Sequence, residues 1–465
     1  MDSVPVRLDH DSDIPLYRQI ADQLRQAIDA GSLAPGSKLP SIRQLSGELQ
    51  VNSVTIVTAY RLLEQEGYAW PRPGSGTYVR VAPAPEPTRQ ISVPHEGINF
   101  ASGTPTPEIF PIEVCRDLLN QVLDRDGGHA FGYQESEGYY PLRQSLQEYL
   151  ATAGVDVKIE NVQVISGAQQ GIDLAAKTLI NHGDEIMVES PTYQGAIASF
   201  MSRGARIIEV PLEKDGPDLA AIAYKLRTHR PKLFYVMPNY QNPTGYSYSQ
   251  MKKEKLLYLA AKHGFTIVED DYLSEMSFSG PPRQPLKALD REGAVFFIKS
   301  FSKILMPGLR LGVLAVPDQL TATVSAAKQY SDISSSGLLQ RTLDLYLRQQ
   351  AWHKHLQSMK EIYAQRYQVL IGAVETYLPQ LRFTAPEGGL HLWLQLPDRF
   401  DSNSLYELCL QKNVLISPGS YFGAQQRWFR LSFAAVHEDE IEPGIKLIAQ
   451  ALETLARPAS ASPLL

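Results

Sequence analysis

Three apolar, strand-like runs in the sequence are each followed by polar side chains that could do chemistry. The runs lie at 233–237, 265–268 and 295–298. The polar residues that follow them are Asn242, Asp270, Tyr272, Ser300, Ser302, Lys303 and Arg310. In an open α/β sheet, functional residues lie at the carboxyl ends of the strands. We therefore expect these side chains to gather at one edge of a sheet.

A fourth run, at 162–165, passes through a glycine turn into a helical pattern. The turn would place the backbone amides of Ala168 and Gln169 at a helix N-terminus. Free N–H groups and the helix dipole stabilise a phosphate there. Such turns are common in α/β proteins, so this one is informative only beside the other groups.

Together these groups match the needs of pyridoxal phosphate. Its aldehyde requires a lysine for a Schiff base, which would be Lys303. Its pyridine nitrogen requires a carboxylate, Asp270, which keeps the ring protonated and makes it an electron sink. The ring hydroxyl is bound by polar donors, and the phosphate is bound by hydroxyls, amides and a guanidinium. The candidates are Asn242 and Tyr272 for the hydroxyl, and Ser300, Ser302, Ala168, Gln169 and Arg310 for the phosphate. Each has an ordinary structural explanation alone, but their conjunction in this order favours the cofactor.

The elements that position these residues belong to a chain of several domains. Its 465 residues exceed one ordinary core. The proline-rich segment 81–97 predicts an extended linker. Residues 1–80 then form one domain and 98–455 a second, α/β domain, in which about 98–130 and 330–455 form a smaller part. Residues 456–465 are expected to be a flexible tail.

The segment before the linker has the pattern of three short helices and a hairpin. A first helix has helical apolar spacing from Leu16 to Ile28, and a second opens at Ser41 in a capping-box sequence. A third buries Ile56, Tyr60 and Leu63. Residues 68–70 and 77–79 flank a proline- and glycine-rich turn and predict two paired strands. This order predicts a winged helix-turn-helix.

The string KLPSIRQLSGELQVNSVTIVTAYRLLEQEGY, followed by RPGSGTYV, resembles the GntR-type winged helix over its whole length. The resemblance implies that the third helix enters the major groove of DNA and the hairpin lies along the backbone. The implied contacts are Ser41 and Arg43 on the second helix, Ser53, Thr55, Thr58 and Arg61 on the third, and Arg72, Ser75 and Thr77 on the wing. Acidic and basic residues nearly balance here, and Ser53 replaces an arginine that relatives often carry. Specificity would then depend on a dimer that reads two half-sites.

From residue 99 to about 450 the chain resembles a fold-type I aminotransferase of the aminoadipate/kynurenine group. With the GntR-type module, it resembles the MocR/GabR family of transcription regulators. The resemblance assigns Lys303 to the Schiff base, Asp270 to the pyridinium, and Tyr272 and Asn242 to the ring hydroxyl. It also assigns Arg310 to the phosphate, Tyr193 to ring stacking, Arg430 to a substrate carboxylate, and Tyr133 to the phosphate of the other subunit. Gly195 stands where GABA-responsive members have a second arginine, which argues against γ-aminobutyrate as the ligand.

Three functions are compatible with these residues. The first is a regulator whose aminotransferase-like domain binds pyridoxal phosphate and senses a small amine or amino acid. The second is an active aminotransferase with an attached DNA-binding domain, in which Lys303, Asp270 and Tyr272 would be catalytic. The third is a regulator that senses pyridoxal phosphate itself. Each implies a homodimer, because fold-type I sites lie at a subunit interface and an operator with paired half-sites needs two reading helices.

Composition and charge exclude several other classes of protein. The net charge of −6 excludes a uniformly basic nucleic-acid binder, so DNA contact needs a local patch. No apolar stretch is long enough to span a bilayer. The two cysteines, Cys115 and Cys409, form no CxxC pair, so no metal or disulfide framework is expected. We expect a cytoplasmic protein.

Overall fold

The computed structural model describes residues 6–9, 12, 14–29, 32–33, 36–65, 68–72, 75–79 and 97–456. They belong to two compact units, 1–91 and 92–465. The predicted linker 81–97, except Gly97, and the predicted tail 456–465, except Ala456, lie outside the described residues. No helix in the described ranges is long and apolar enough to cross a membrane.

The N-terminal unit is a winged helix-turn-helix, as the sequence predicts. Its helices are α1 (Leu16–Asp29), α2 (Ile42–Leu49) and α3 (Ser53–Gln65), and its wing is the antiparallel pair β1 (Ala69–Arg72) and β2 (Gly76–Val79). Leu24 of α1, Leu45 of α2 and Ile56 of α3 are fully buried against one another. Ser41 caps α2 by accepting a hydrogen bond from the Gln44 backbone N–H at 3.1 Å.

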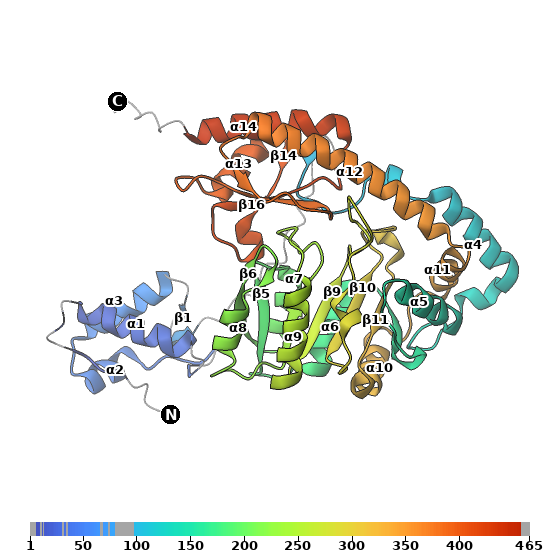
Figure 1. Cartoon of the computed structure of the whole chain (residues 1–465). Helices are drawn as coiled ribbons and strands as arrows, with labels where there is room; N and C mark the ends of the chain where they lie inside the picture. Colours follow the sequence, from blue (N-terminus) through green and yellow to red (C-terminus); the bar gives the residue numbers. More distant parts are fainter. Residues whose placement is uncertain are drawn as a thin grey trace. The chain divides into compact units, whose positions relative to one another are not determined.

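The second unit is built on an eight-stranded, mainly parallel sheet with helices packed along it (Figure 1). The strand order is β4-β11-β10-β9-β8-β5-β6-β7. The strands are β4 (Val162–Ile165), β5 (Glu185–Ser190), β6 (Arg206–Glu213), β7 (Gly216–Pro217), β8 (Leu233–Val236), β9 (Thr266–Asp271), β10 (Val295–Ser300) and β11 (Gly312–Ala315). The central strands β8, β9 and β10 are parallel and buried on both faces, which explains the apolar residues with which each begins or continues, at 233–236, 267–268 and 295–298.

The helices of the large sheet follow its strands in sequence. They are α5 (Tyr140–Thr152), α6 (Ala168–Leu179), α7 (Gln194–Ser202), α8 (Leu219–Lys225), α9 (Gln250–His263), α10 (Thr321–Asp332) and α11 (Gly337–Arg348). Helix α4 (Ile112–Asp126) packs against α11. Parallel pairing of the central strands brings their carboxyl ends to one edge, where functional side chains collect.

A smaller antiparallel sheet has the order β12-β13-β16-β15. Its strands are β12 (Arg382–Phe383), β13 (His391–Gln395), β15 (Ser417–Pro418) and β16 (Trp428–Ser432). Helices α12 (Ala351–Tyr377), α13 (Ser402–Gln411) and α14 (Glu438–Ala456) accompany it (Figure 1). Strand β3 (Ile98–Asn99) pairs with β14 (Val414–Leu415), which joins the start of the unit to its C-terminal part.

Candidate functional site

A cavity of about 360 Å³ lies where the carboxyl ends of the large sheet meet β13 and β16 of the small sheet. Its lining contains every residue that the sequence predicts for the cofactor and the ligand carboxylate, except Tyr133. The lining residues are Gly103, Ala168, Gln169, Tyr193, Met237, Asn242, Asp270, Tyr272, Ser300, Ser302, Lys303, Pro307, Arg310, His391 and Arg430.

Lys303 lies just beyond the end of β10, and its amine is enclosed by the cavity wall. Burial, followed by the nearby cations Arg430 and Arg310, lowers the pKa of Lys303 to about 8. The nearest hydrogen-bond partner is Thr104, whose Oγ1 lies 3.5 Å from Nζ. More of this amine is therefore neutral near neutral pH than in an ordinary lysine, and the neutral form is the nucleophile that attacks an aldehyde.

Asp270, near the end of β9, is a buried carboxylate with one oxygen unpaired. The hydroxyl of Tyr235 donates to Oδ2 at 2.7 Å, whereas Oδ1 makes no hydrogen bond with any described residue. Burial raises the pKa of Asp270 to about 6. Buried acceptors are nearly always satisfied, so Oδ1 fits a cationic N–H donor such as a protonated pyridine nitrogen.

The residues predicted to bind the phosphate lie around the N-terminus of α6. Gly167, with φ of +90°, turns the chain into the helix at Ala168. A Cβ on Gly167 would lie 2.7 Å from a guanidinium nitrogen of Arg310, so glycine permits this close approach. Arg310 donates to the Ser166 carbonyl at 2.5 Å, and Ser300 Oγ accepts from the Ser302 backbone N–H at 3.2 Å. Helix N–H groups, hydroxyls and one guanidinium therefore face a common point.

Tyr193 precedes α7, and its ring borders the cavity. Its hydroxyl donates to Gln169 Oε1 at 3.0 Å, which holds the ring in place. A Cβ at Gly195 would lie 2.4 Å from this hydroxyl. A glycine at 195 is thus required by the position of Tyr193, because any side chain there would displace the ring.

Tyr272 and Asn242 line the cavity, and each already makes one hydrogen bond within the protein. Tyr272 donates its hydroxyl proton to the Tyr240 carbonyl at 2.6 Å, so its oxygen can only accept from a bound group. Asn242 Oδ1 accepts from Nη1 of Arg430 at 2.7 Å, which leaves the amide nitrogen as a donor. A hydroxyl on the cofactor ring could be recognised by this donor and acceptor together.

Arg430 on β16 is a buried guanidinium without a carboxylate partner in the described part of the chain. It donates to Asn242, to the Ala101 carbonyl and to Ser417 Oγ, and its Nε is unpaired. Burial lowers the pKa of Arg430 to about 10. A buried cation without a counter-ion is costly, so this site favours an anionic group such as a ligand carboxylate.

Tyr133 does not join these groups within one chain. It lies just before α5, is 86% exposed, and is absent from the cavity lining. The family resemblance implies that Tyr133 contacts the phosphate bound by the other subunit, and this stays a prediction.

Sequence reasoning missed His391, which enters the cavity from β13. It lies within Gly-Gly-Leu-His-Leu-Trp, and this one polar residue in an apolar strand was the available signal. Sequence reasoning also missed Tyr235, which lies inside the apolar run of β8.

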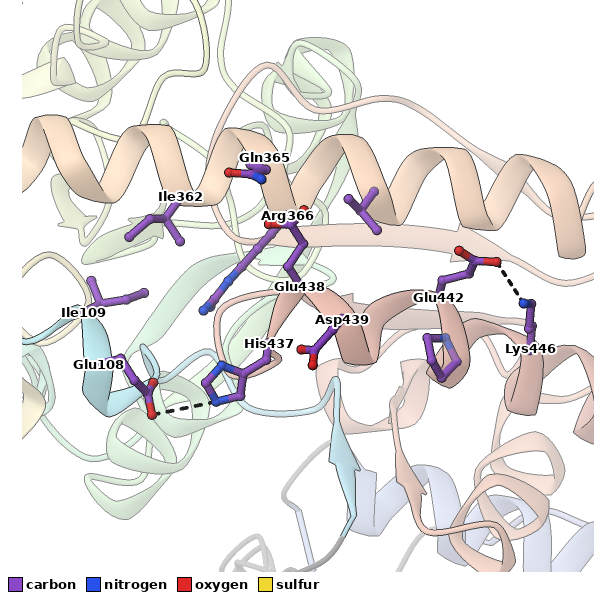
Figure 2. Close-up of a pocket in the computed structure, with 12 residues that line it drawn as sticks. Glu108, Ile109, Ile362, Gln365, Arg366, His437, Glu438, Asp439, Glu442 and Lys446 are labelled. Carbon is purple, nitrogen blue, oxygen red and sulfur yellow. Dashed lines mark ion pairs between the residues drawn. The ribbon is translucent and has the colours of Figure 1, made fainter.

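A second hollow, of about 760 Å³, lies in the small domain between the residues 107–109, α12 and α14 (Figure 2). Some of its charged residues pair with one another: Glu108 lies 3.7 Å from His437, and Glu442 pairs with Lys446 at 2.8 Å. Arg366 donates from its wall to backbone carbonyls. None of the predicted site residues lines it.

The predicted DNA contacts lie on α2, α3 and the wing. Ser41, Arg43, Ser53, Arg61 and Ser75 are exposed, and Thr55, Thr58 and Thr77 are half-buried. The side chain of Arg72 lies outside the described residues.

Four of these hydroxyls are already engaged within the unit: Ser41 accepts from the Gln44 backbone N–H, and Ser53 donates to Ser46 Oγ at 3.4 Å. Thr58 donates to the Val54 carbonyl at 2.9 Å, and Ser75 shares a 2.7 Å hydrogen bond with Tyr78. Arg43 and Arg61 are the exposed cations of this set on the helices, and are therefore the candidates for phosphate contact.

The fold and the site define a fold-type I aminotransferase-like domain preceded by a winged helix. Residues 95–448 match the family described as aminotransferase class I and II, and residues 16–79 match the gntR family of bacterial regulatory proteins. The chain belongs to the MocR-type regulators, in which a gntR-type domain is fused to a class I and II aminotransferase domain.

Individual relatives cover either the whole chain or its second unit. The probable rhizopine catabolism regulatory protein MocR of Rhizobium meliloti is 30% identical over 96% of each chain. The aromatic-amino-acid aminotransferase 1 of Thermococcus litoralis is 33% identical over 77% of this chain and 88% of its own. The structure of LysN, an alpha-aminoadipate aminotransferase from Thermus thermophilus complexed with N-(5'-phosphopyridoxyl)-L-leucine, has a TM-score of 0.74 at 31% identity and covers 77% and 93%.

Proposed function

We propose that this chain is a sequence-specific transcription regulator whose large domain binds pyridoxal phosphate through Lys303 and senses a small amine or amino acid. The observation that carries the proposal is the composition of one cavity. It contains a lysine of lowered pKa, the unpaired Oδ1 of Asp270, and Arg430, which has no carboxylate partner in the described ranges. These three groups are the ones a pyridoxal-phosphate site for amino acids needs.

Each residue would perform a defined task around the cofactor. When bound, pyridoxal phosphate supplies an aldehyde that condenses with amines and a ring that withdraws electrons. Lys303 would provide the resident amine, and burial keeps part of it neutral. Asp270, oriented by Tyr235, would hold a proton on the ring nitrogen. The amides at the start of α6 and Arg310 would hold the phosphate.

The ligand would be recognised at two points. Its amine would take the place of the Lys303 amine, and its carboxylate would bind Arg430. Both groups line the same cavity, where Arg430 is buried and Lys303 is half-buried. Ionic contacts are stronger away from bulk water, so an amino acid would bind better than an amine without a carboxylate.

Ligand binding would be read out as a change in DNA affinity. A ligand shifts a conformational equilibrium only by its different affinity for the two states. Couplings of roughly 1–3 kcal/mol are typical and change affinity by about 5- to 150-fold. A homodimer would supply the two reading helices that paired half-sites require.

An active aminotransferase is the second candidate, and a specific observation favours it. Every group that transamination requires lines the cavity, including a nucleophilic lysine and a ring-nitrogen partner. A regulator that senses pyridoxal phosphate itself is the third candidate, because the cofactor groups alone would suffice for it.

One experiment separates the three. The full chain, loaded with pyridoxal phosphate, is mixed with a labelled DNA fragment that it protects and with a panel of amino acids. Keto-acid release and DNA retention are followed together. The proposal expects altered retention with slow or stalled release. Rapid multiple turnover with unchanged retention indicates an enzyme, and a response to pyridoxal phosphate alone indicates a cofactor sensor.

A further inference from the structure

His391 is a buried polar side chain that the functions assigned above do not use. It lies on β13, is 3% exposed, and lines the cavity with Lys303 and Arg430. Its ring stacks on that of Tyr272, with centroids 6.4 Å apart and an interplanar angle of 25°. The imidazole is therefore held in one orientation beside the groups that would bind the ligand.

One ring nitrogen of His391 is buried without a hydrogen bond to any described residue. Nδ1 of His391 is shielded from solvent and makes no hydrogen bond with any residue in the described part of the chain. Buried polar atoms are nearly always hydrogen-bonded, and leaving one unpaired is costly. A Cβ on Gly103 would lie 3.2 Å from Cε1 of His391, so this glycine leaves the edge of the ring open. The unpaired Nδ1 and the open edge of the His391 ring indicate that this side chain binds a ligand group.

The charges around the ring determine what it can recognise. Burial, and then the cations Arg430 and Lys303, hold the pKa of His391 well below its ordinary value. The imidazole is therefore neutral near neutral pH, with one N–H donor and one acceptor nitrogen. It suits a neutral polar group, such as a hydroxyl or a carboxamide, that can both donate and accept.

The register of the small sheet separates His391 from the carboxylate site. His391 is paired with Ser432, whereas Arg430 is paired with Trp393, so His391 and Arg430 are diagonal neighbours on one face. Diagonal residues on adjacent strands are about 7–8 Å apart. An amino acid whose carboxylate binds Arg430 can therefore place its side chain beside His391 in the same cavity.

We propose that His391 is a specificity-determining residue that hydrogen-bonds a hydroxyl or carboxamide on the side chain of the amino acid whose carboxylate binds Arg430. The proposal rests on the proposed function and extends it by naming a substrate class. Amino acids with a short polar side chain bind better than apolar amino acids of the same shape. A site that lacks this contact would not distinguish the two.

The test uses matched pairs of amino acids on the full chain loaded with pyridoxal phosphate. Threonine is compared with valine, and asparagine with leucine. Binding is measured from the change in visible absorbance of the cofactor and by calorimetry, without turnover. The wild-type protein should bind the polar member of at least one pair about fivefold more tightly, which is the effect of one hydrogen bond.

His391→Phe keeps an aromatic ring against Tyr272 but removes both nitrogens, so the ratio within each pair should fall to about one. If that variant loses the cofactor, His391→Leu replaces it with the same expectation. His437→Phe, at the hollow between α12 and α14, is the matched control and should keep the wild-type ratio.

The outcomes separate this inference from the function beneath it. A ratio unchanged by His391→Phe, or a wild-type protein that does not prefer the polar member, overturns the inference and leaves the proposed function standing. If the cofactor is bound but no amino acid changes its absorbance or produces heat of binding in the wild-type protein, the inference about His391 and the proposed function both fail.

Discussion

The hydroxyl of Tyr235 donates a 2.7 Å hydrogen bond to Oδ2 of Asp270, and the second carboxylate oxygen remains unpaired. Tyr235 is fully buried in β8, beside the strand that carries Asp270. The hydrogen bond lowers the pKa of Asp270, which burial raises. Tyr235 therefore both orients this carboxylate and favours its charged form.

Tyr235→Phe should weaken pyridoxal phosphate binding by about tenfold near pH 7, because a hydrogen bond to a charged group is lost. The pKa of Asp270 would rise above about 6, so less of it would be ionised to hold the ring proton. Titration of the cofactor-free protein with pyridoxal phosphate measures the effect. Tyr363→Phe is the control, because the buried hydroxyl of Tyr363 makes no hydrogen bond in the described structure. Equal affinities for the two variants would contradict the role of Tyr235.

Asp270→Asn should stabilise the cofactor-free protein at neutral pH while abolishing tight cofactor binding. The pKa of Asp270 is raised from 3.8 to about 6, so the native state binds this proton more tightly than the unfolded state does. The stability that the protonated carboxyl of Asp270 contributes is fully present below about pH 4 and is lost as the pH rises through about 6. The free energy of unfolding of the variant should exceed that of the wild type by up to about 3 kcal/mol above this window, and by little below it.

Urea unfolding of both proteins on either side of that window provides the measurement. The comparison must be a difference between the two proteins, because Glu189 and Glu269 are also buried carboxyls whose pKa is raised to about 7. A stability difference that does not change with pH would show that Asp270 is not the titrating group.

The rate at which Lys303 captures pyridoxal phosphate should rise with pH through about 8, because only the neutral amine attacks the aldehyde. Arg430→Gln removes a nearby positive charge, so the pKa of Lys303 should rise and the midpoint should move to higher pH. Stopped-flow absorbance across a pH series records this midpoint. Arg382→Gln, on the exposed edge strand β12, should leave it unchanged. A midpoint that moves to lower pH in Arg430→Gln would disprove the electrostatic explanation.

Arg43→Ala and Thr55→Ala should abolish specific DNA retention and leave the cofactor spectrum intact. Both residues lie on the winged helix, which has its own buried core. DNA retention and visible absorbance are measured on the same preparations, with Arg291→Ala in the second unit as the control. The salt dependence of wild-type binding should be moderate, since few cations are available for phosphate contact. Specific binding by a chain that lacks residues 1–80 would refute the assignment.

The amino-acid sequence by itself determined the class of fold and most of the cavity. Unbroken apolar runs are typical of central parallel strands, and their carboxyl ends meet at one edge, so Lys303, Asp270 and Asn242 could be predicted together. The helical spacing and capping pattern before residue 80 likewise predicted the winged helix, because such local patterns depend only on neighbouring residues.

Only the tertiary structure decided which residues inside apolar strands face the site. In the sequence Tyr235 is indistinguishable from a core residue, and His391 shows only a polar residue in apolar surroundings. Strand register and the meeting of two sheets determine the partners of both. The same holds for Gly195, whose lack of a side chain is explained by the ring of Tyr193 above it. The contacts of Tyr235 with Asp270 and of His391 with Tyr272 join residues far apart in the chain, and they exist only once the strands and sheets have packed together.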